Sequence, residues 1–570
     1  MTEATNTHIE KDRLLSTEED DDTIIIQHHR LPIGIWFVER LGALSRLDPV
    51  VKKKCYQVLI VVLTFCCYTT YHLTRKTISV VKSTLHPDCN SSDEECANPS
   101  NHCRGWEPFD SSDGKTLLGT LDYAWLFSYA IAMFFSGQLA ERSNLRYFLT
   151  VGMLGSSLSV ALFGMGYFLH IHKLYYFILV QIVGGIFQSS GWPGVVAVMA
   201  NWFGKGKRGF IMGIWNCHTS VGNILGTVIP AIWAHNDWGW SFLVSSFIMV
   251  AVTIAIFLLL VIDPSHIALP PPRHHLESRE SSPISPLPSS PAPVNGDYKS
   301  DHQKLDRKTR VKHGEEKAIS FWRALLIPGV IEFSIALFFA KLVSYAFLFW
   351  LPYYIKNTRI GGHCLDTFEA SALSTTFDVG GMIGGILAGL VSDLLQARAF
   401  TSTASLYMAI PALYLYRQFG GESLALNIIL MIITGACVNG PYAMITTAVS
   451  ADLGTHKSLQ GSHKAKATVT AIIDGTGSIG AAVGPLLTGL LSNHVSWDSV
   501  FYLFMGASLT AALLLSRLVY GEVQMWWHAW TTKRSRLSVE INDDSDNETR
   551  LLASSDSQSD APLVEETVFN

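Results

Sequence analysis

The chain has 570 residues, of which 48% are hydrophobic and only 16% are charged. Soluble domains carry about 25% charged residues, so this composition excludes a soluble protein. The net charge of −5 reflects acidic, polar tails at 17–22 and 540–570, which are expected to be disordered. Several apolar stretches reach the roughly 20 residues needed to cross a bilayer. The sequence predicts an all-α, polytopic membrane protein.

Twelve apolar segments follow one another along the chain. They span residues 55–80, 117–140, 146–168, 174–199, 208–234, 240–262, 325–355, 369–394, 399–417, 424–450, 466–492 and 497–520. Residues 263–319 are rich in proline and serine and are predicted to be a disordered cytosolic linker. The predicted parts are therefore a cytosolic N-terminal tail (1–54), a six-helix half (55–262), this linker (263–319), a second six-helix half (320–520) and a cytosolic C-terminal tail (521–570).

Charge and cysteine patterns predict the orientation. Lysine and arginine gather in the loops on one side of a twelve-span arrangement, which marks that side as cytosolic together with both termini. The loop 83–115 falls on the other side and holds the sequon Asn90-Ser91-Ser92 as well as Cys89, Cys96 and Cys103. We expect this loop to be lumenal, with glycosylation at Asn90 and two of the three cysteines able to pair.

The two halves repeat each other. The element "GQLAER" at 137–142 follows the second segment, and "GLVSDL" at 389–394 follows the eighth. Ser-x-Gly-x-x-x-Gly occurs at 220–226 and again at 478–484, a pattern that also packs membrane helices closely. An internal duplication around a midplane site is typical of secondary transporters. Within the loop elements, Glu141, Arg142 and Asp393 are expected to form state-dependent ion pairs.

Cations inside apolar segments point to an anionic substrate. "YHLTRKTISVVKS" at 71–83 continues an apolar run yet contains Arg75 and Lys76. A charge in the bilayer centre is costly and marks a functional site, and arginine matches phosphate oxygens with a planar fork of donors. Tyr71 and His72 lie within one turn of Arg75; His72 is either a donor or a packing residue. Lys82, two turns beyond, is expected to snorkel.

The second half offers a further cation and two acids. Lys341 in "LFFAKLVSYAF" is expected either to bind the same ligand or to pair with Asp378 or Asp474. The two acids are candidates for binding a proton or a sugar hydroxyl, or for neutralising Lys341. Helix breaks are predicted at Trp192-Pro193 and at Asn439-Gly440-Pro441, where Asn439 and freed backbone groups would line a cavity.

At this level of detail the chain resembles a known family. The loop element after the second segment is similar to that of the major facilitator superfamily. The stretches "YHLTRK", "ERSNLRYFL" and "FWLPYYI" resemble the organophosphate:phosphate antiporters, and "KLVSYAFLFWLP", "STTFDVGGMIGGILAGLVSD" and "TVTAIIDGTGSIGAAVGPLL" resemble the longer sugar-phosphate exchangers of solute carrier family thirty-seven. The resemblance covers nearly all of 50–520. It implies the superfamily fold, with twelve transmembrane helices in two six-helix halves.

The resemblance also implies site residues. The family's phosphate-binding arginine of the first helix falls on Arg75. The bacterial antiporters carry a second arginine in the seventh helix, where this chain has Ser344, so Lys341 one turn earlier is the expected substitute. Their fifth-helix histidine falls on Thr219, with His218 beside it.

The implied activity is exchange of inorganic phosphate for a sugar phosphate, glucose 6-phosphate, across the endoplasmic reticulum membrane. The chain is therefore expected to be no enzyme and to need no cofactor, metal or nucleic acid. Two rivals stay open: a sugar-phosphate sensor without turnover, and a proton-coupled organic-anion carrier that uses Asp378 or Asp474. An acidic-dileucine pattern at 10–15 leaves an endolysosomal address open beside the reticulum, and the plasma membrane is a further alternative.

Overall fold

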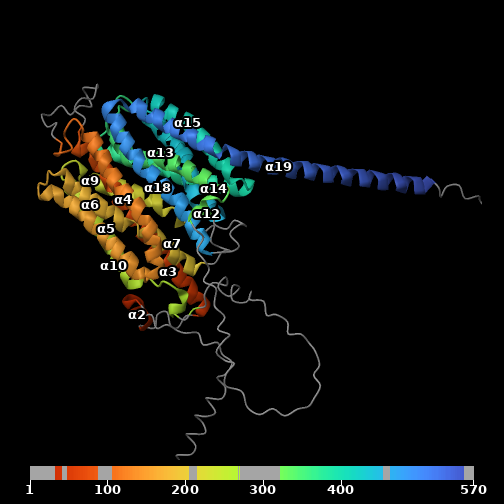
Figure 1. Ribbon diagram of the computed structural model, residues 1–570, viewed down its shortest axis with the longest axis horizontal. Coiled ribbons are helices and arrows are strands. Elements are labelled where there is room, and N and C mark those ends of the chain that lie inside the picture. The colour runs from red at the N-terminus through yellow and green to blue at the C-terminus, as the bar shows by residue number, and fades with distance from the viewer. Residues whose placement is uncertain are drawn as a thin grey trace, which may run out of the picture.

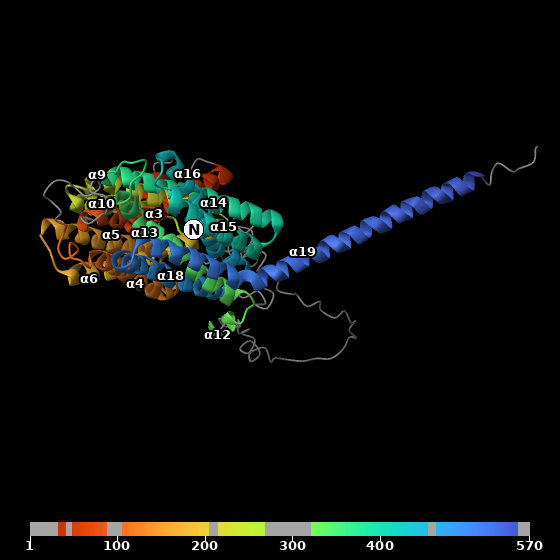
Figure 2. The ribbon, with the colours of Figure 1, turned by 90° about the horizontal axis from the view of Figure 1, so that it is seen from above.

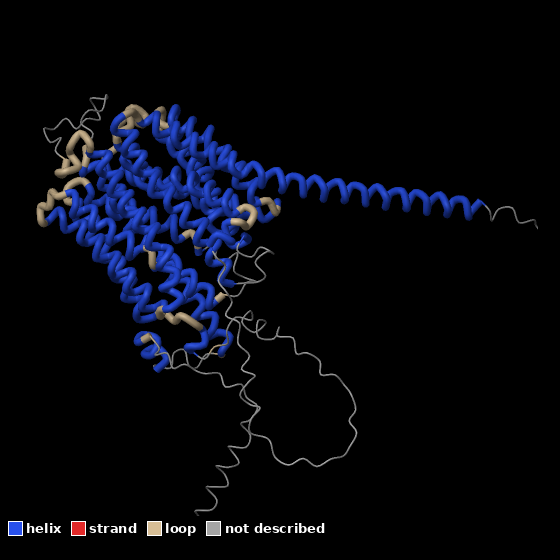
Figure 3. Tube along the Cα trace, in the orientation of Figure 1, coloured by secondary structure: helices blue, strands red, loops and turns tan. Residues whose placement is uncertain are grey.

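The computed structural model describes residues 32–40, 48–87, 105–203, 215–267, 269, 321–453 and 463–556. Asn90, Cys89, Cys96 and Cys103 lie outside these ranges, as do most of the predicted linker and the N-terminal tail up to Leu31. Figure 3 shows helices joined by short loops throughout the described part. The prediction of an all-α protein is confirmed.

The described helices of the first half lie between Ile33 and Ile267. They are α2 (Ile33–Arg40), α3 (Pro49–Leu85), α4 (Gly114–Arg142), α5 (Leu145–Phe168), α6 (Leu174–Gln188), α7 (Gly191–Trp202), α9 (His218–Ala234), α10 (Trp238–Leu259) and the short 3₁₀ helix η2 (Pro264–Ile267). The sequence analysis did not foresee α2, in which Ile35 is buried.

The described helices of the second half begin at Phe321. They are α12 (Phe321–Leu325), α13 (Val330–Lys356), α14 (Thr367–Leu395), α15 (Arg398–Phe419), α16 (Leu424–Met444), the π-helix η3 (Ile445–Val449), α17 (Ser450–Leu453), α18 (His463–His494) and α19 (Trp497–Asp556). Figure 1 shows the first half in red to yellow beside the second half in green to blue. A helix thus covers each of the twelve predicted segments.

Nine of the described helices are long and apolar enough to cross a membrane by length and composition alone. The remaining segments fall on α3, α9 and α15. Helix α3 contains the buried cations Arg75, Lys76 and Lys82. These charged residues lower the mean hydropathy of α3. The number of twelve spans therefore stays a prediction, although the helical order matches it.

One expectation about the C-terminal tail was wrong. Residues 540–556 were expected to be disordered, but α19 continues to Asp556 and leaves the bundle as a single helix (Figure 2). The physical reason lies in the local sequence: no glycine or proline occurs between Glu522 and Asp556, so nothing interrupts the helix that starts in the bundle.

The repeated glycines hold equivalent helices together in both halves. A Cβ on Gly226 of α9 would meet the Leu73 carbonyl of α3 at 2.5 Å, and a Cβ on the equivalent Gly484 of α18 would meet the Leu342 carbonyl of α13 at 2.2 Å. Gly480, one turn before Gly484, lies equally close to α13: its Cβ would meet the Phe338 carbonyl at 2.0 Å. The first helix therefore packs on the fifth, and the seventh on the eleventh, through the same close backbone approach. The repeat seen in the sequence corresponds to a repeated contact.

The apolar core shows which end of the molecule joins the halves. One buried cluster contains side chains of both halves, among them Val81, Leu121, Trp125, Phe349 and Tyr353. The three other described clusters each stay within one half. The shared cluster lies where α3 ends and α4 begins, hereafter the Leu85 end; the opposite end, where α3 begins, is the Pro49 end. The halves are thus joined by apolar packing at the Leu85 end.

Cys364, in the loop between α13 and α14, is disulfide-bonded. The sequence analysis did not consider it. The other described cysteines, Cys55, Cys66, Cys67, Cys217 and Cys437, form no disulfide, so the partner of Cys364 lies outside the described residues. The expected pairing within 89–103 is not tested.

We expect Gly480→Ala to lower the thermal unfolding midpoint of the detergent-purified protein by several degrees, because the new methyl group forces α18 away from α13. Overpacking of this kind costs about 1–3 kcal/mol. The matched control is Gly506→Ala in α19, where a Cβ meets nothing within 4 Å. Equal midpoints for the two variants would contradict the close-packing role.

Candidate functional site

Arg75 lies in α3 at the interface between the halves and is 5% exposed. Its guanidinium carbon lies 4.8 Å from the ring centroid of Trp125 and 5.0 Å from that of Tyr129, both on α4. Nη2 donates to Gln188 Oε1 of α6 at 3.4 Å, and Nη1 donates to the Tyr345 hydroxyl of α13 at 3.4 Å. Both halves therefore contribute to the surroundings of this cation.

The charge of Arg75 has no counter-ion in the described part of the chain. None of the ion pairs there includes Arg75, and its buried Nε has no hydrogen-bond partner. Aromatic faces and two long hydrogen bonds only partly replace the water that a buried charge loses. A bound anion with oxygen acceptors would complete this environment.

The two predicted lysines have different partners. Lys341 Nζ is paired with Asp474 Oδ1 of α18 at 2.7 Å, which is the alternative that the sequence left open. Lys76 donates to the Leu348 carbonyl of α13 and so contacts the other half. Lys76 also interacts electrostatically with Asp378, but no ion pair within 4 Å forms between them.

Two tyrosines connect the cations of the two halves. Lys341 lies over the Tyr442 ring at 5.5 Å, and Tyr442 lies edge-on to Tyr345 at 6.2 Å. Tyr345 in turn accepts the hydrogen bond from Arg75. Arg75 and Lys341 therefore border one aromatic-lined region between α3 and α13.

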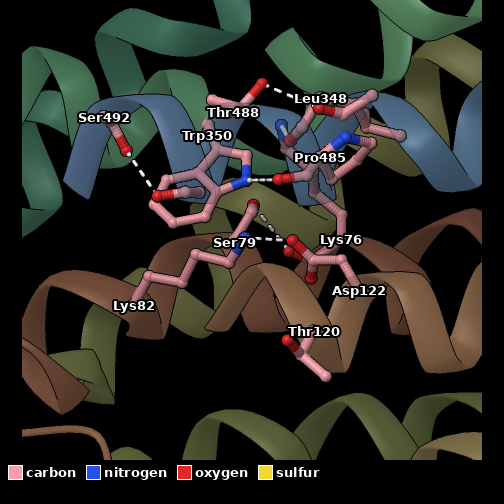
Figure 4. A network of polar contacts seen from close by, with 12 residues as sticks. Lys76, Ser79, Lys82, Thr120, Asp122, Leu348, Trp350, Pro485, Thr488 and Ser492 are labelled. Carbon is pink, nitrogen blue, oxygen red and sulfur yellow. Dashed lines mark hydrogen bonds and ion pairs between the residues drawn. The ribbon is translucent and has the colours of Figure 1, made fainter. Parts of the chain in front are cut away.

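The expectation for Lys82 was wrong. Its side chain is fully buried and forms an ion pair with Asp122 of α4 (Figure 4). Snorkelling requires a free path to the interface, and the Trp350 ring of α13 closes that path, with its centroid 4.0 Å from Lys82 Nζ.

The histidines form a polar group beside Arg75 on α3 and α9. His72 Nδ1 is 3.1 Å from Asn223 Oδ1, and Asn223 Nδ2 donates to Asp378 Oδ1 of α14 at 3.0 Å. His218 is buried, with Thr219 Oγ1 at 3.2 Å from its Nδ1 and no partner for its Nε2 among the described residues. The ring of His72 lies 6.4 Å from that of His218. His72, His218 and Asp378 are therefore parts of one cross-half cluster.

The other predicted site residues, Tyr71, Ser344 and Asn439, form hydrogen bonds with nearby side chains. The Tyr71 hydroxyl is 3.0 Å from Ser190 Oγ, and the Ser344 hydroxyl donates to Asn439. The helix break expected at Trp192-Pro193 lies between α6 and α7, at residues 189–190. Pro441 lies inside α16, and the irregular turn is instead the π-helix η3.

Among the described gating residues, Asp393 has an ion-pair partner within its own half. Asp393, near the end of α14, is paired at 2.6 Å with Arg398, the first residue of α15; Asp393 is exposed and Arg398 is partly exposed. Arg142 is exposed at the end of α4, and the Glu141 side chain lies outside the described part. Their state-dependent pairing stays a prediction.

Sequence reasoning missed several residues of the site and also the acid that pairs with Lys82. Gln188 beside Arg75 and Asp122 beside Lys82 are polar side chains in apolar helices, a signal that could have identified both. Trp125, Tyr129 and Tyr345 gave no such signal, because an aromatic residue in an apolar helix is ordinary; only the meeting of α3, α4 and α13 makes them neighbours of Arg75.

Comparison with known proteins identifies the family. The model of the Major Facilitator Superfamily matches residues 64–462 and 366–525. The chain belongs to the major facilitator superfamily. Mouse "Glucose-6-phosphate exchanger SLC37A2" is 50% identical over 501 residues, covering 86% of this chain and 96% of that protein. "Putative glycerol-3-phosphate transporter 1" of Arabidopsis thaliana is 48% identical over 500 residues, covering 86% and 92%.

These relatives confirm the resemblance to the sugar-phosphate exchanger family, and the chain is a transporter rather than an enzyme. Solved structures agree on the fold. A D-xylose–proton symporter has a TM-score of 0.52 at 13% identity, covering 81% of this chain and 97% of its own. A bacterial homologue of the human lysosomal transporter Spinster has a TM-score of 0.51 at 14% identity, covering 83% and 97%.

We expect Gln188→Glu to weaken the binding of inorganic phosphate to the purified transporter by about tenfold or more, because a carboxylate placed 3.4 Å from Arg75 would neutralise the guanidinium. The measurement is isothermal titration or phosphate-dependent thermal stabilisation. Gln57→Glu, which adds the same charge near Trp202 at the Pro49 end, serves as the control. Unchanged phosphate affinity in Gln188→Glu would remove Arg75 from the anion site.

Proposed function

We propose that the transporter exchanges inorganic phosphate for a sugar phosphate, most simply glucose 6-phosphate, by alternating access. The observation that carries this proposal is the buried, uncompensated guanidinium of Arg75 between the halves. The named activities of the mouse and plant relatives support a phosphorylated substrate.

Phosphate chemistry suits the donors around Arg75. The free Nε and the two long hydrogen bonds of the Nη groups leave donor capacity for oxygen acceptors. A guanidinium binds a phosphate group through two parallel N–H···O bonds. The Tyr345 hydroxyl then becomes free to donate to a third oxygen. Arg75 is the proposed phosphate anchor, with Lys76 bordering it.

The charge balance of the interior supports exchange rather than one-way leakage. Lys82 and Lys341 are each neutralised by a buried acid, whereas Arg75 is not. Sealing an unpaired charge away from water on both sides is costly, so the empty carrier is expected to close poorly. A bound phosphate ester neutralises Arg75, and the occluded state then becomes accessible in either direction.

Aromatic and imidazole side chains are available to contact the sugar portion of the ligand. Tyr68 packs against Trp192 at 5.4 Å and against His218 at 4.7 Å between ring centroids. Apolar ring faces suit the C–H groups of a sugar, and the unpartnered His218 Nε2 offers a hydrogen bond to a hydroxyl. His72, His218, Thr219, Tyr71, Ser344 and Asn439 are the proposed bordering residues.

The proposed setting is the endoplasmic reticulum membrane with both termini in the cytosol. The distribution of lysine and arginine supports this orientation, and the Leu85 end then faces the lumen. An endolysosomal or plasma membrane address remains the alternative.

Proteoliposomes test the exchange. We expect labelled phosphate to enter vesicles preloaded with phosphate or glucose 6-phosphate and not empty vesicles, and Arg75→Lys to reduce this uptake by at least about tenfold through loss of the bidentate fork. Arg417→Lys, an arginine that pairs with Asp498 outside the interface, is the matched control. Uptake into empty vesicles driven by a pH gradient would replace exchange with proton-coupled transport, and phosphate binding without uptake would indicate a sensor.

Asp474 is expected to compete with phosphate for Lys341, since the two are paired at 2.7 Å in the structure. Asp474→Asn should therefore tighten phosphate binding several-fold while slowing exchange, because the released lysine holds the ligand longer. Equilibrium binding and exchange rates, measured on the same preparation, check both parts. Weaker binding in Asp474→Asn would show that the acid supports the site and does not compete in it.

A further inference from the structure

The Leu85 end contains a buried ion pair that the transport site does not use. Lys82 of α3 and Asp122 of α4 both have fully buried side chains and pair with each other. Both belong to the first half. Asp122 Oδ1 has no hydrogen-bond partner among the residues that the structure describes, so this pair has given up its water without full replacement there.

The second half supplies the cover of this pair (Figure 4). The Trp350 ring of α13 lies over Lys82 Nζ with its centroid at 4.0 Å, and Phe349 follows at 5.7 Å. Trp350 is held in place by α18, because its Nε1 donates to the Pro485 carbonyl at 3.0 Å. The Trp350 ring, which is itself buried, thus lies directly against a dehydrated ion pair of the other half.

Close backbone packing surrounds this contact. A Cβ on Gly489 of α18 would meet the Lys115 carbonyl of α4 at 2.6 Å and the Trp350 ring at 3.1 Å. Gly489 and the shared apolar cluster bring the halves together at the same place as the ion pair. The end is therefore closed by apolar packing, with one charged element inside it.

We propose that Lys82, Asp122 and Trp350 form the gate at the Leu85 end, and that the ion pair keeps this gate reversible. The inference rests on the alternating-access part of the proposed function, in which the halves must separate at this end. When the second half moves away it takes Trp350 with it, while Lys82 and Asp122 stay together on α3 and α4 and regain water.

Two opposing free-energy contributions decide whether the gate is closed or open. Burial of the apolar cluster favours the closed state, and rehydration of the ion pair favours the open one. The cation–π contact of Lys82 with Trp350 recovers part of the hydration energy in the closed state. A gate of apolar residues alone would lack the second contribution and would stay closed.

This balance predicts that some substitutions close the gate and that others open it. The apolar double variant Lys82→Met with Asp122→Leu removes the charges and should hold the gate closed. Asp122→Asn leaves Lys82 buried without its acid, and Trp350→Phe weakens the cation–π contact; both should favour opening. If these residues had a structural role alone, all three variants would shift the opening of the gate in the same direction.

The experiment measures how readily water reaches the gate. Ser79, one turn before Lys82 and fully buried, is replaced by cysteine as a near-isosteric reporter. An impermeant maleimide is added to the compartment that the Leu85 end faces, in the absence of substrate, and the labelling rate is recorded. We expect Asp122→Asn to raise the rate by about tenfold, which corresponds to about 1.4 kcal/mol, Trp350→Phe to raise it by less, and the double variant to lower it.

The control variant is Asp498→Asn, which breaks the Arg417–Asp498 pair within the second half and should leave labelling unchanged. Size-exclusion profiles report folding; if Asp122→Asn does not fold, Trp350→Phe and the double variant decide. Faster labelling in the double variant, or no change with Trp350→Phe, would overturn the gate. Because no substrate is present, these outcomes are independent of whether phosphate is the ligand.

Discussion

The uncompensated charge of Arg75 is the constraint on which the rest of the interior depends. In the described part of the chain, two of the four buried cations on α3 and α13 pair with an acid, and Lys76 donates to a carbonyl. Arg75 has no ion-pair partner there; it contacts two ring faces and makes two long hydrogen bonds. Burying a charge without an ion-pair partner is costly. The surroundings of Arg75 therefore differ from those of the two paired lysines, and the proposed anion site accounts for this difference.

Position along α3 assigns different tasks to its charged residues. Arg75 and Lys76 lie where both halves contribute contacts, whereas Lys82 lies within the apolar contact at the Leu85 end. These groups are separated by only two turns, so any movement of α13 relative to α3 changes the surroundings of all of them. In the proposed mechanism, this one pair of helices therefore couples substrate neutralisation to gate opening, without a separate transmission element.

The sequence predicted the helical architecture and the repeat, because these depend on hydropathy and spacing. Its assignment of Arg75 as the phosphate anchor stays a prediction. Its one suggestion of a partner across helices, Asp378 or Asp474 for Lys341, was only one of several alternatives. Lys82 was misjudged because snorkelling depends on what covers the side chain, and Trp350 lies about 270 residues away in the chain. The extent of α19 was underestimated for a different reason: polar composition argues against burial, but it does not prevent a helix that has already started from continuing.

The replacement of a second arginine by Ser344 is compatible with this interior. Ser344 donates to Asn439, and Lys341 one turn earlier is neutralised by Asp474. A symmetric pair of arginines would place two uncompensated positive charges between the halves. The halves could then close only around a ligand that carries two full negative charges. With Lys341 balanced by its own acid, only one guanidinium needs neutralising, and the second half can contribute a graded charge that depends on whether the lysine stays with Asp474 or turns to the ligand. In the proposed mechanism, the asymmetry of the two halves thus adjusts how tightly a phosphate ester is held, while Arg75 decides that one is held at all.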